Sequence, residues 1–299
     1  MIFMKEIREF KLLLFLIVTT YSSAQNTIIE NFNQKNMIKH PSYTAEIVSS
    51  RCSIELLIND IPSFCNYENG TMSVDWPLNL LILEDGVQNF ELRILPIKGT
   101  TSISEKAFAK IKIVVREAID EYVAQEEISP EIEIKFTDKK NLPLYIHKGQ
   151  FTSKVPYQLE GWKKSIDLSQ ENQERLFEEI IQWNDKLRDI YVNFKQEEYL
   201  KIFKSKNTEI YKTLYLNHLE IEEQNNSVFH PKFKDLVSLP NGSYKLKLSA
   251  NGKLASVILP YKLPGFTYEP KIKDEDSLGI SVIVFFHRKN IGESLEIIR

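Results

Sequence analysis

The sequence predicts a mixed β and α+β fold: an N-terminal antiparallel β-sandwich-like domain, followed by helices packed on a C-terminal antiparallel sheet. Three segments of the first half have hydrophobic residues at every second position, which is the period of a half-buried strand: 90–94, 111–115 and 132–136, with the intervening residues polar except for Val114. Over residues 169–194 the hydrophobic period lengthens to three or four residues, as in an amphipathic helix. From residue 242 the period of two returns, which gives an α+β order to the second half.

The composition fits a globular protein. Of 299 residues, 42% are hydrophobic and 26% are charged, fractions that exclude a disordered, collagen-like or coiled-coil chain. The formal net charge is −3. Because phosphate binding needs a concentrated positive field, this balance argues against nucleic acid as a partner.

Residues 1–24 have the pattern of a signal peptide. Lys5, Arg8 and Lys11 form a positive region, the run 12–18 is apolar, and small residues precede a cleavage point after Ala24. The apolar run is far shorter than the ~20 residues of a membrane span. We therefore expect a protein exported to the periplasm or the extracellular space, with no membrane span after cleavage. The polar residues 25–43 are expected to form a flexible leader or an added edge strand.

The two cysteines, Cys52 and Cys65, are expected to form a disulfide. An exported protein meets an oxidising compartment. A hairpin centred near residue 58 or 59 would place the two cysteines opposite each other, and closing such a loop would stabilise the fold by about 3 kcal/mol. Free thiols are the alternative.

The β-sandwich-like domain is predicted to cover residues 44–160. Turn signals separate its strands at 69–70, 85–86, 98–99, 129–130 and 141–143. One segment is ambiguous, since residues 107–125 also carry hydrophobic residues at helical spacing. The β-branched run from Ile111 to Val115 favours a strand that ends at about residue 116.

The α+β domain is predicted to cover residues 161–299, with two or three helices and then about four strands. Asp167 is expected to cap a helix over about 169–194. A second helical stretch starts at Glu197 and restarts near Thr208. Asn251-Gly252 predicts a type I′ hairpin turn, in which both central residues need a positive φ. A Pro-rich loop over 260–271 and an apolar strand over 280–286 follow.

No catalytic or cofactor signature is found in the sequence. None of the five histidines lies three or four residues from another, so no metal site is predicted. The nucleophile elbow GxSxG and the phosphate-binding GxGxxG and GxxxxGK[ST] loops are absent as well. We therefore predict no cofactor, no metal and no catalytic residue.

Four residues are candidates for contact with a ligand or partner. Phe266 and Tyr268 lie in the predicted loop 260–271, and aromatic residues are enriched where a protein grips a partner. His287 and Arg288 follow an apolar strand end next to a turn. The alternatives are a core role for the aromatic pair and solubilising charges for His287 and Arg288.

Two functions remain open. The first is an exported, non-catalytic binding protein whose partner is another protein or an envelope component. The second is a secreted hydrolase that uses paired carboxylates on cell-wall or glycan substrates. The missing signatures favour the first, and the oligomeric state is open.

Overall fold

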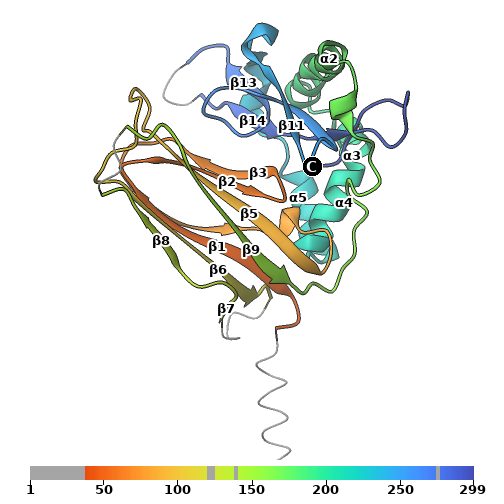
Figure 1. Ribbon diagram of the computed structural model, residues 1–299. Coiled ribbons are helices and arrows are strands. Elements are labelled where there is room, and N and C mark those ends of the chain that lie inside the picture. Colours follow the sequence, from red (N-terminus) through yellow and green to blue (C-terminus); the bar gives the residue numbers. More distant parts are fainter. Residues whose placement is uncertain (1–37, 120–124, 138–140, 274–276) are drawn as a thin grey trace, which may run out of the picture.

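The computed structural model describes residues 38–119, 125–137, 141–273 and 277–299. The predicted signal peptide, and the predicted leader through residue 37, lie outside the described residues. In the described part, antiparallel sheets come first, followed by four α-helices and further antiparallel sheets (Figure 1). The predicted mixed β and α+β fold is thus confirmed. None of the described helices is long and apolar enough to cross a membrane.

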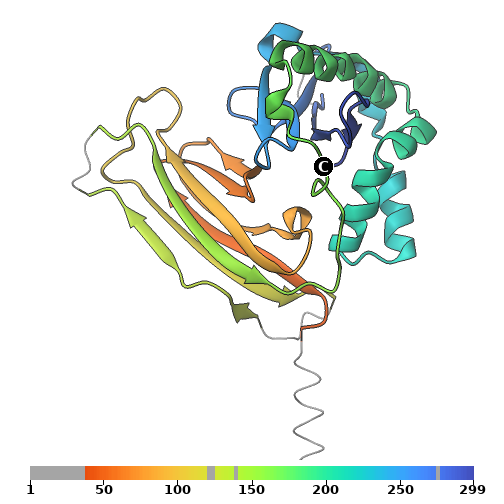
Figure 2. The ribbon, with the colours of Figure 1, turned by 45° about the vertical axis from the view of Figure 1, so that its right-hand side comes forward.

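The first half contains two antiparallel sheets that form two layers (Figure 2). One sheet has the strand order β4-β1-β6-β7, with β8 also paired to β6, and the other has the order β3-β2-β5-β9. The strands and one short 3-10 helix are β1 (Pro41–Ser50), β2 (Ser53–Ile58), β3 (Ile61–Asn66), β4 (Thr71–Pro77), η1 (Asn79–Leu81), β5 (Gly86–Leu95), β6 (Phe108–Glu117), β7 (Glu126–Glu127), β8 (Ile132–Lys135) and β9 (Tyr145–Ser153).

The hydrophobic residues at every second position of the strands form the core between these two sheets. Ile47 and Ile111 from one sheet share a hydrophobic cluster with Leu56 and Leu92 from the other. Of the ambiguous segment 107–125, residues 108–117 form the strand β6, which is paired with β1 along its whole length, and residues 120–124 lie outside the described part. The β-branched residues of β6 fit a pleated surface that is covered on one side, which explains why the strand prevails over the helix.

The predicted leader extends too far. Strand β1 begins at Pro41 and lies between β4 and β6, so residues 41–43 belong to the interior of a sheet. The backbone N–H of Tyr43 donates to Oδ1 of the buried Asn79, at 2.7 Å. Proline tolerates the first position of a strand, and the polar residues before Pro41 hide this start from a periodicity argument.

The predicted disulfide is wrong, because Cys52 and Cys65 are free. The hairpin turns at Asn59 and Asp60, and a bulge after Leu56 shifts the register further, so Cys65 lies opposite Glu55. Cys52 is therefore displaced from Cys65 along the strands. The thiol of Cys52 is buried and donates to the carbonyl of Phe108 at 3.5 Å, while Cys65 is half-buried.

The helices of the second half are α2 (Gln173–Val192), α3 (Gln196–Ile202), α4 (Lys204–Thr213) and α5 (His218–Asn226), with short 3-10 helices η2 (Leu168–Gln170), η3 (Pro231–Asp235) and η4 (Asn241–Ser243). The predicted helix start was too early. Asp167 caps only η2, and the side chain of Asn172 accepts from the N–H of Arg175 to cap α2. Helix α5 was not predicted, although its capping box, Asn217 with Glu220, is visible in the sequence.

Seven short strands complete the described second half, more than the predicted four. They form the sheets β10-β13-β14 and β11-β12-β15-β16, with the bounds β10 (Leu236–Ser238), β11 (Lys245–Ser249), β12 (Leu254–Ile258), β13 (Gly265–Pro270), β14 (Ile280–Ile283), β15 (Phe286–His287) and β16 (Glu296–Ile297). The predicted turn between β11 and β12 is confirmed, with φ of 53° at Asn251 and 85° at Gly252. The predicted loop 260–271 is corrected, since β13 occupies half of it.

The two halves share buried contacts. Leu254, Phe285 and Ile298 from the second half belong to the hydrophobic cluster of the sandwich. Arg299 adds a polar link, because its Nε donates to the carbonyl of Leu80 at 2.8 Å. The predicted boundary between residues 160 and 161 therefore separates two kinds of architecture whose cores touch.

Candidate functional site

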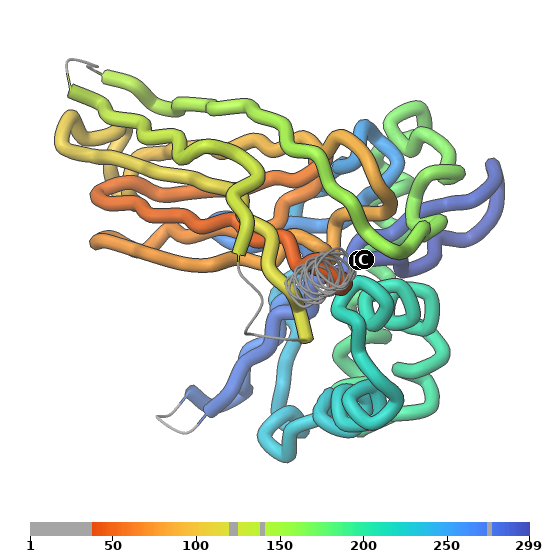
Figure 3. Tube along the Cα trace, turned by 90° about the horizontal axis from the view of Figure 1, so that it is seen from below, coloured from red at the N-terminus to blue at the C-terminus, as the bar shows by residue number. Residues whose placement is uncertain are grey.

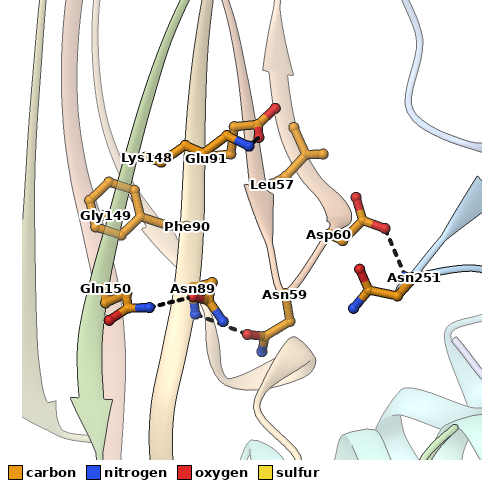
Figure 4. Close-up of a pocket in the computed structure, with 10 residues that line it drawn as sticks. All are labelled: Leu57, Asn59, Asp60, Asn89, Phe90, Glu91, Lys148, Gly149, Gln150 and Asn251. Atoms are coloured by element: carbon orange, nitrogen blue, oxygen red, sulfur yellow. Dashed lines mark hydrogen bonds and ion pairs between the residues drawn. The ribbon is translucent and has the colours of Figure 1, made fainter.

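A pocket of about 600 Å³ lies where the outer face of the sheet β3-β2-β5-β9 meets a turn of the second half (Figure 4). Small-ligand sites commonly fall in this size range. Four carboxamide side chains line it together with two carboxylates and one ammonium group, so we call it the amide pocket. Its lining residues are Leu57, Asn59, Asp60, Asn89, Phe90, Glu91, Lys148, Gly149, Gln150 and Asn251.

Two tight turns form one wall of the amide pocket. Asn59 and Asp60 connect β2 to β3 with φ of 51° and 66°, values that asparagine and aspartate tolerate better than most residues. The turn at Asn251 has the same character. The N–H of Asn251 donates to Oδ2 of Asp60 at 2.9 Å, which joins the two halves at the rim.

A row of carboxamides runs on the pocket floor from β9 over β5 to the turn between β2 and β3 (Figure 4). The Nε2 of Gln150 donates to Oδ1 of Asn89 at 2.8 Å. The backbone N–H of Asn89 in turn donates to Oδ1 of Asn59, at 3.0 Å. Because β5 and β9 pair in the register Asn89 opposite Gln150, the row follows from strand pairing across 61 residues.

Several polar atoms of this row remain open to a ligand. Among the described residues, no hydrogen-bond partner is found for Nδ2 of Asn89, Oε1 of Gln150 or the side-chain amide of Asn251. A carboxamide offers both donors and acceptors. The pocket therefore presents both kinds of group close together, on residues that are exposed to solvent.

The charges next to the row are paired. Glu91 contacts Nζ of Lys148 at 3.2 Å and Nε of Arg93 at 2.5 Å. Burial raises the pKa of Glu91, but the hydrogen bonds from Arg93 and Lys148 outweigh it and hold that pKa below its ordinary value. Glu91 is thus ionised and compensated, which leaves little net charge for a charged ligand to meet.

Gly149 brings an aromatic ring against the pocket floor. A Cβ at this position would lie 2.3 Å from Cζ of Phe90, so only glycine allows the ring this close to the backbone of β9. Phe90 is almost fully buried. The pocket floor is therefore closely packed, and the polar side chains that line the pocket lie directly over the hydrophobic core.

The predicted contact residues Phe266 and Tyr268 lie in β13 and have no exposed surface. The ring of Tyr268 reaches helix α2, where its hydroxyl donates to the carbonyl of Asn184 at 2.9 Å. In this conformation both rings fill the space between α2 and the sheet, which is the core role that the sequence left as the alternative.

His287 and Arg288 are also buried, at 2% and 6% exposure. The guanidinium of Arg288 contacts Glu171 at 2.9 Å and Glu179 at 2.8 Å, so it ties the last strands to the start of α2. Burial lowers the pKa of His287. Neither residue is a solubilising surface charge, and neither lies in the amide pocket.

A larger pocket, of about 760 Å³, borders the predicted loop 260–271. Its exposed aromatic residue is Tyr261, in the loop before β13, rather than Phe266. The ring of Tyr261 already contacts Tyr67 with a centroid distance of 5.1 Å, and Nζ of Lys98 lies 5.4 Å from its centroid. These groups satisfy one another, so the amide pocket offers more open hydrogen-bonding groups.

Sequence reasoning recognised the turns near Asn59 and at Asn251 but not that they border one pocket with Asn89 and Gln150. No local motif marks Asn89 or Gln150, because only the pairing of β5 with β9 brings them together. The described residues contain no group of three or more His, Cys, Asp or Glu side chains that could hold a metal ion.

Comparisons with known proteins add no relative: no family model, no curated protein and no solved structure matches this chain.

Proposed function

We propose that this protein is an exported, non-catalytic binding protein that holds an uncharged, hydroxyl-rich ligand, a glycan of the cell envelope, in the amide pocket. The observation that carries the proposal is the row Asn59, Asn89 and Gln150, which presents open donors and acceptors on a rigid floor. A sugar hydroxyl is both a donor and an acceptor, so it complements a carboxamide. The signal-peptide pattern of residues 1–24 supports export.

Charge favours a neutral ligand over an ionic one. Glu91 is compensated by Lys148 and Arg93, and Asp60 accepts from the N–H of Asn251. A charged ligand would have to displace one of these partners, whereas a hydroxyl-rich ligand leaves them in place.

The second candidate, a glycan hydrolase, has one observation in its favour, since Asp60 and Glu91 line the same pocket. A general acid for glycoside cleavage needs a raised pKa. The pKa of Glu91 is lowered instead, by its hydrogen bonds to Arg93 and Lys148. The geometry thus supports binding better than cleavage.

The test is a glycan array followed by calorimetry on the secreted chain. The double variant Asn89→Ala/Gln150→Ala should weaken binding of the retained glycan at least tenfold, because it removes the two carboxamides of the row that have open groups. The control is Gln182→Ala/Gln224→Ala, which removes two exposed carboxamides of helices α2 and α5. We expect the control to bind like the unchanged protein.

Two results would contradict the proposal. If no glycan is retained, or if the double variant binds as well as the control, the amide pocket is not the site. If the retained glycan is cleaved and Asp60→Asn stops the cleavage, the hydrolase is correct. Recovery of the chain with residues 1–24 in place, from the cytoplasm alone, would contradict export.

A further inference from the structure

A second pocket, of about 490 Å³, opens at another part of the junction between the two halves. One face of α4 forms a wall of it through Lys204, Ser205, Thr208 and Lys212. Lys204, Thr208 and Lys212 follow one another at intervals of four residues, and Ser205 lies three residues before Thr208, so they project from the same side of the helix. His287 and Lys289, at the end of β15, form the facing wall, and we call this the lysine pocket.

The lysine pocket has an excess of positive charge. Its two carboxylates are already paired, Glu160 with Lys164 at 3.3 Å and Glu209 with Arg299 at 2.9 Å. Lys289 is paired with Glu296 at 2.9 Å. Lys204 and Lys212 have no ion-pair partner among the residues that the structure describes. Two ammonium groups are therefore left without counter-charges.

A buried donor points to the same kind of ligand. The Nε2 of His287 has no hydrogen-bond partner within the described residues, although only 2% of this residue is exposed. The nearest carboxylate oxygen, on Glu296, is 4.0 Å away, beyond hydrogen-bond distance. A buried polar group without a partner costs about 1–3 kcal/mol.

The partner of the other ring nitrogen assigns the proton. Nδ1 of His287 lies 2.7 Å from Oγ of Ser165. Among the described residues, Nδ1 is the one acceptor within reach of the Ser165 hydroxyl, so we assign this hydroxyl as the donor to Nδ1. The neutral ring then carries its proton on Nε2. The lysine pocket thus holds an imidazole N–H donor beside two hydroxyls and two ammonium groups.

From this set of donors we infer that the lysine pocket binds a phosphate-type oxyanion. Lys204 and Lys212 supply the charge, Ser205 and Thr208 supply hydroxyl donors, and His287 supplies the N–H that lacks an acceptor. The oxyanion provides three or four acceptor oxygens and the missing negative charge. This site is separate from the amide pocket and does not depend on the proposed glycan binding.

The experiment is a calorimetric titration of the full chain with inorganic phosphate, at constant ionic strength balanced with sodium chloride. We expect saturable binding of one phosphate. Lys204→Gln/Lys212→Gln should weaken it at least tenfold. The matched control, Lys201→Gln/Lys234→Gln, removes the same charge at two exposed positions outside the pocket and should leave the affinity within twofold.

A second readout follows His287 itself. Its ring resonances should shift on titration with phosphate in the control variant and stay in place in Lys204→Gln/Lys212→Gln. Because all four lysines are exposed, urea unfolding should show that both double variants fold. The proposal is overturned if phosphate shows no saturation, if chloride competes equally, or if both double variants lose affinity alike.

A vesicle-binding experiment distinguishes two sources of the phosphate group, a lipid headgroup and a soluble phosphate. Vesicles of phosphatidic acid in phosphatidylcholine, compared with phosphatidylcholine alone, test a lipid headgroup. Retention on the first vesicles alone, lost in Lys204→Gln/Lys212→Gln, assigns the site to a headgroup. Binding of inorganic phosphate without retention on vesicles assigns it to a free phosphate or a soluble phosphate ester.

Discussion

The two halves of the molecule bury different kinds of polar side chain. In the described part of the first half, the buried polar residues are mostly neutral, as Asn79 and Gln88 are, and the exception is the carboxylate of Glu117, whose side chain is buried next to Nδ1 of His40 at 2.8 Å. The second half buries His287, Arg288 and Arg299, all within its last thirteen residues. A buried charge needs a partner, so both arginines are paired with carboxylates of the helical region.

This difference teaches where the protein is sensitive to charge. The sandwich has ion pairs too, such as Glu91 with Arg93 and Lys148, but these are partly exposed, and carboxylates and lysines do not titrate near pH 7, so its stability should depend little on pH near neutrality. The second half is held partly by ion pairs, so a change in one charge acts on it directly. The two pockets follow the same division, since neutral carboxamides dominate one and unpaired lysines the other.

The largest expected effect comes from removing the partner of Arg299. Glu209→Ala should lower the free energy of unfolding by roughly 3–5 kcal/mol, because it leaves a cation buried at 3% side-chain exposure without its counter-charge. Gly161 also loses the acceptor of its N–H, at 2.8 Å. Urea unfolding followed by circular dichroism measures the change.

The control is Glu178→Ala on α2, where the carboxylate is exposed. Its cost should stay within about 0.5 kcal/mol. Equal effects from the two variants would break the comparison, since they would mean that the buried pair contributes no more than a surface charge.

The difference between the halves was only partly visible in the sequence. The order of strands and helices, the β6 strand and the turn at Asn251 follow from local periodicity and turn chemistry. The burial of His287 and Arg288 does not, because their partners Ser165 and Glu171 lie more than a hundred residues away. Distant pairing also builds the amide pocket, so a local reading could not assemble it.

The failed disulfide has the same kind of cause. A shift of the turn centre, together with one bulge, moves every opposing pair along a hairpin. A prediction from residue spacing alone therefore pairs the wrong residues across the hairpin. The expected loop around Phe266 and Tyr268 fails for a related reason, since Pro260 and Pro264 precede the strand β13 and Pro270 is its last residue.

A smaller effect is expected from a neutral hydrogen bond in the second half. Tyr268→Phe removes the bond from the hydroxyl to the carbonyl of Asn184 and should cost about 1 kcal/mol. The ring stays in place, so glycan and phosphate binding should be unchanged. A loss of ligand binding with unchanged stability would return Tyr268 to the candidate contacts and contradict its core role.

The pH dependence of stability tests the role of His287 in the second half. Burial lowers the pKa of His287 in the folded state, so the unfolded chain binds its proton more readily. The stability from the neutral ring is therefore complete above the unfolded pKa of about 6.5 and is lost as the pH falls through that value toward the folded pKa. Glu296 at 4.0 Å opposes the shift, while Lys289 adds to it.

The measurement is the unfolding midpoint between pH 5 and pH 8 for the unchanged chain and for His287→Gln. We expect the midpoint of the unchanged chain to fall below pH 6.5 and that of the variant to stay flatter over the same window. If the midpoints of the two chains change with pH in parallel, the pH dependence of stability comes from groups other than His287.

The smallest expected effect concerns the first half, where the cysteines are neutral and unpaired. A reducing agent should leave the unfolding midpoint unchanged, because Cys52 and Cys65 form no bond that it could break. A disulfide closing this loop would have contributed about 3 kcal/mol.

The reactivity of the two thiols gives a second measurement. Burial raises the pKa of each thiol to about 11. Since the thiolate is the reactive form, iodoacetamide should label both cysteines slowly until urea unfolds the sandwich. A midpoint that falls on reduction would restore the disulfide and contradict the register of the β2–β3 hairpin.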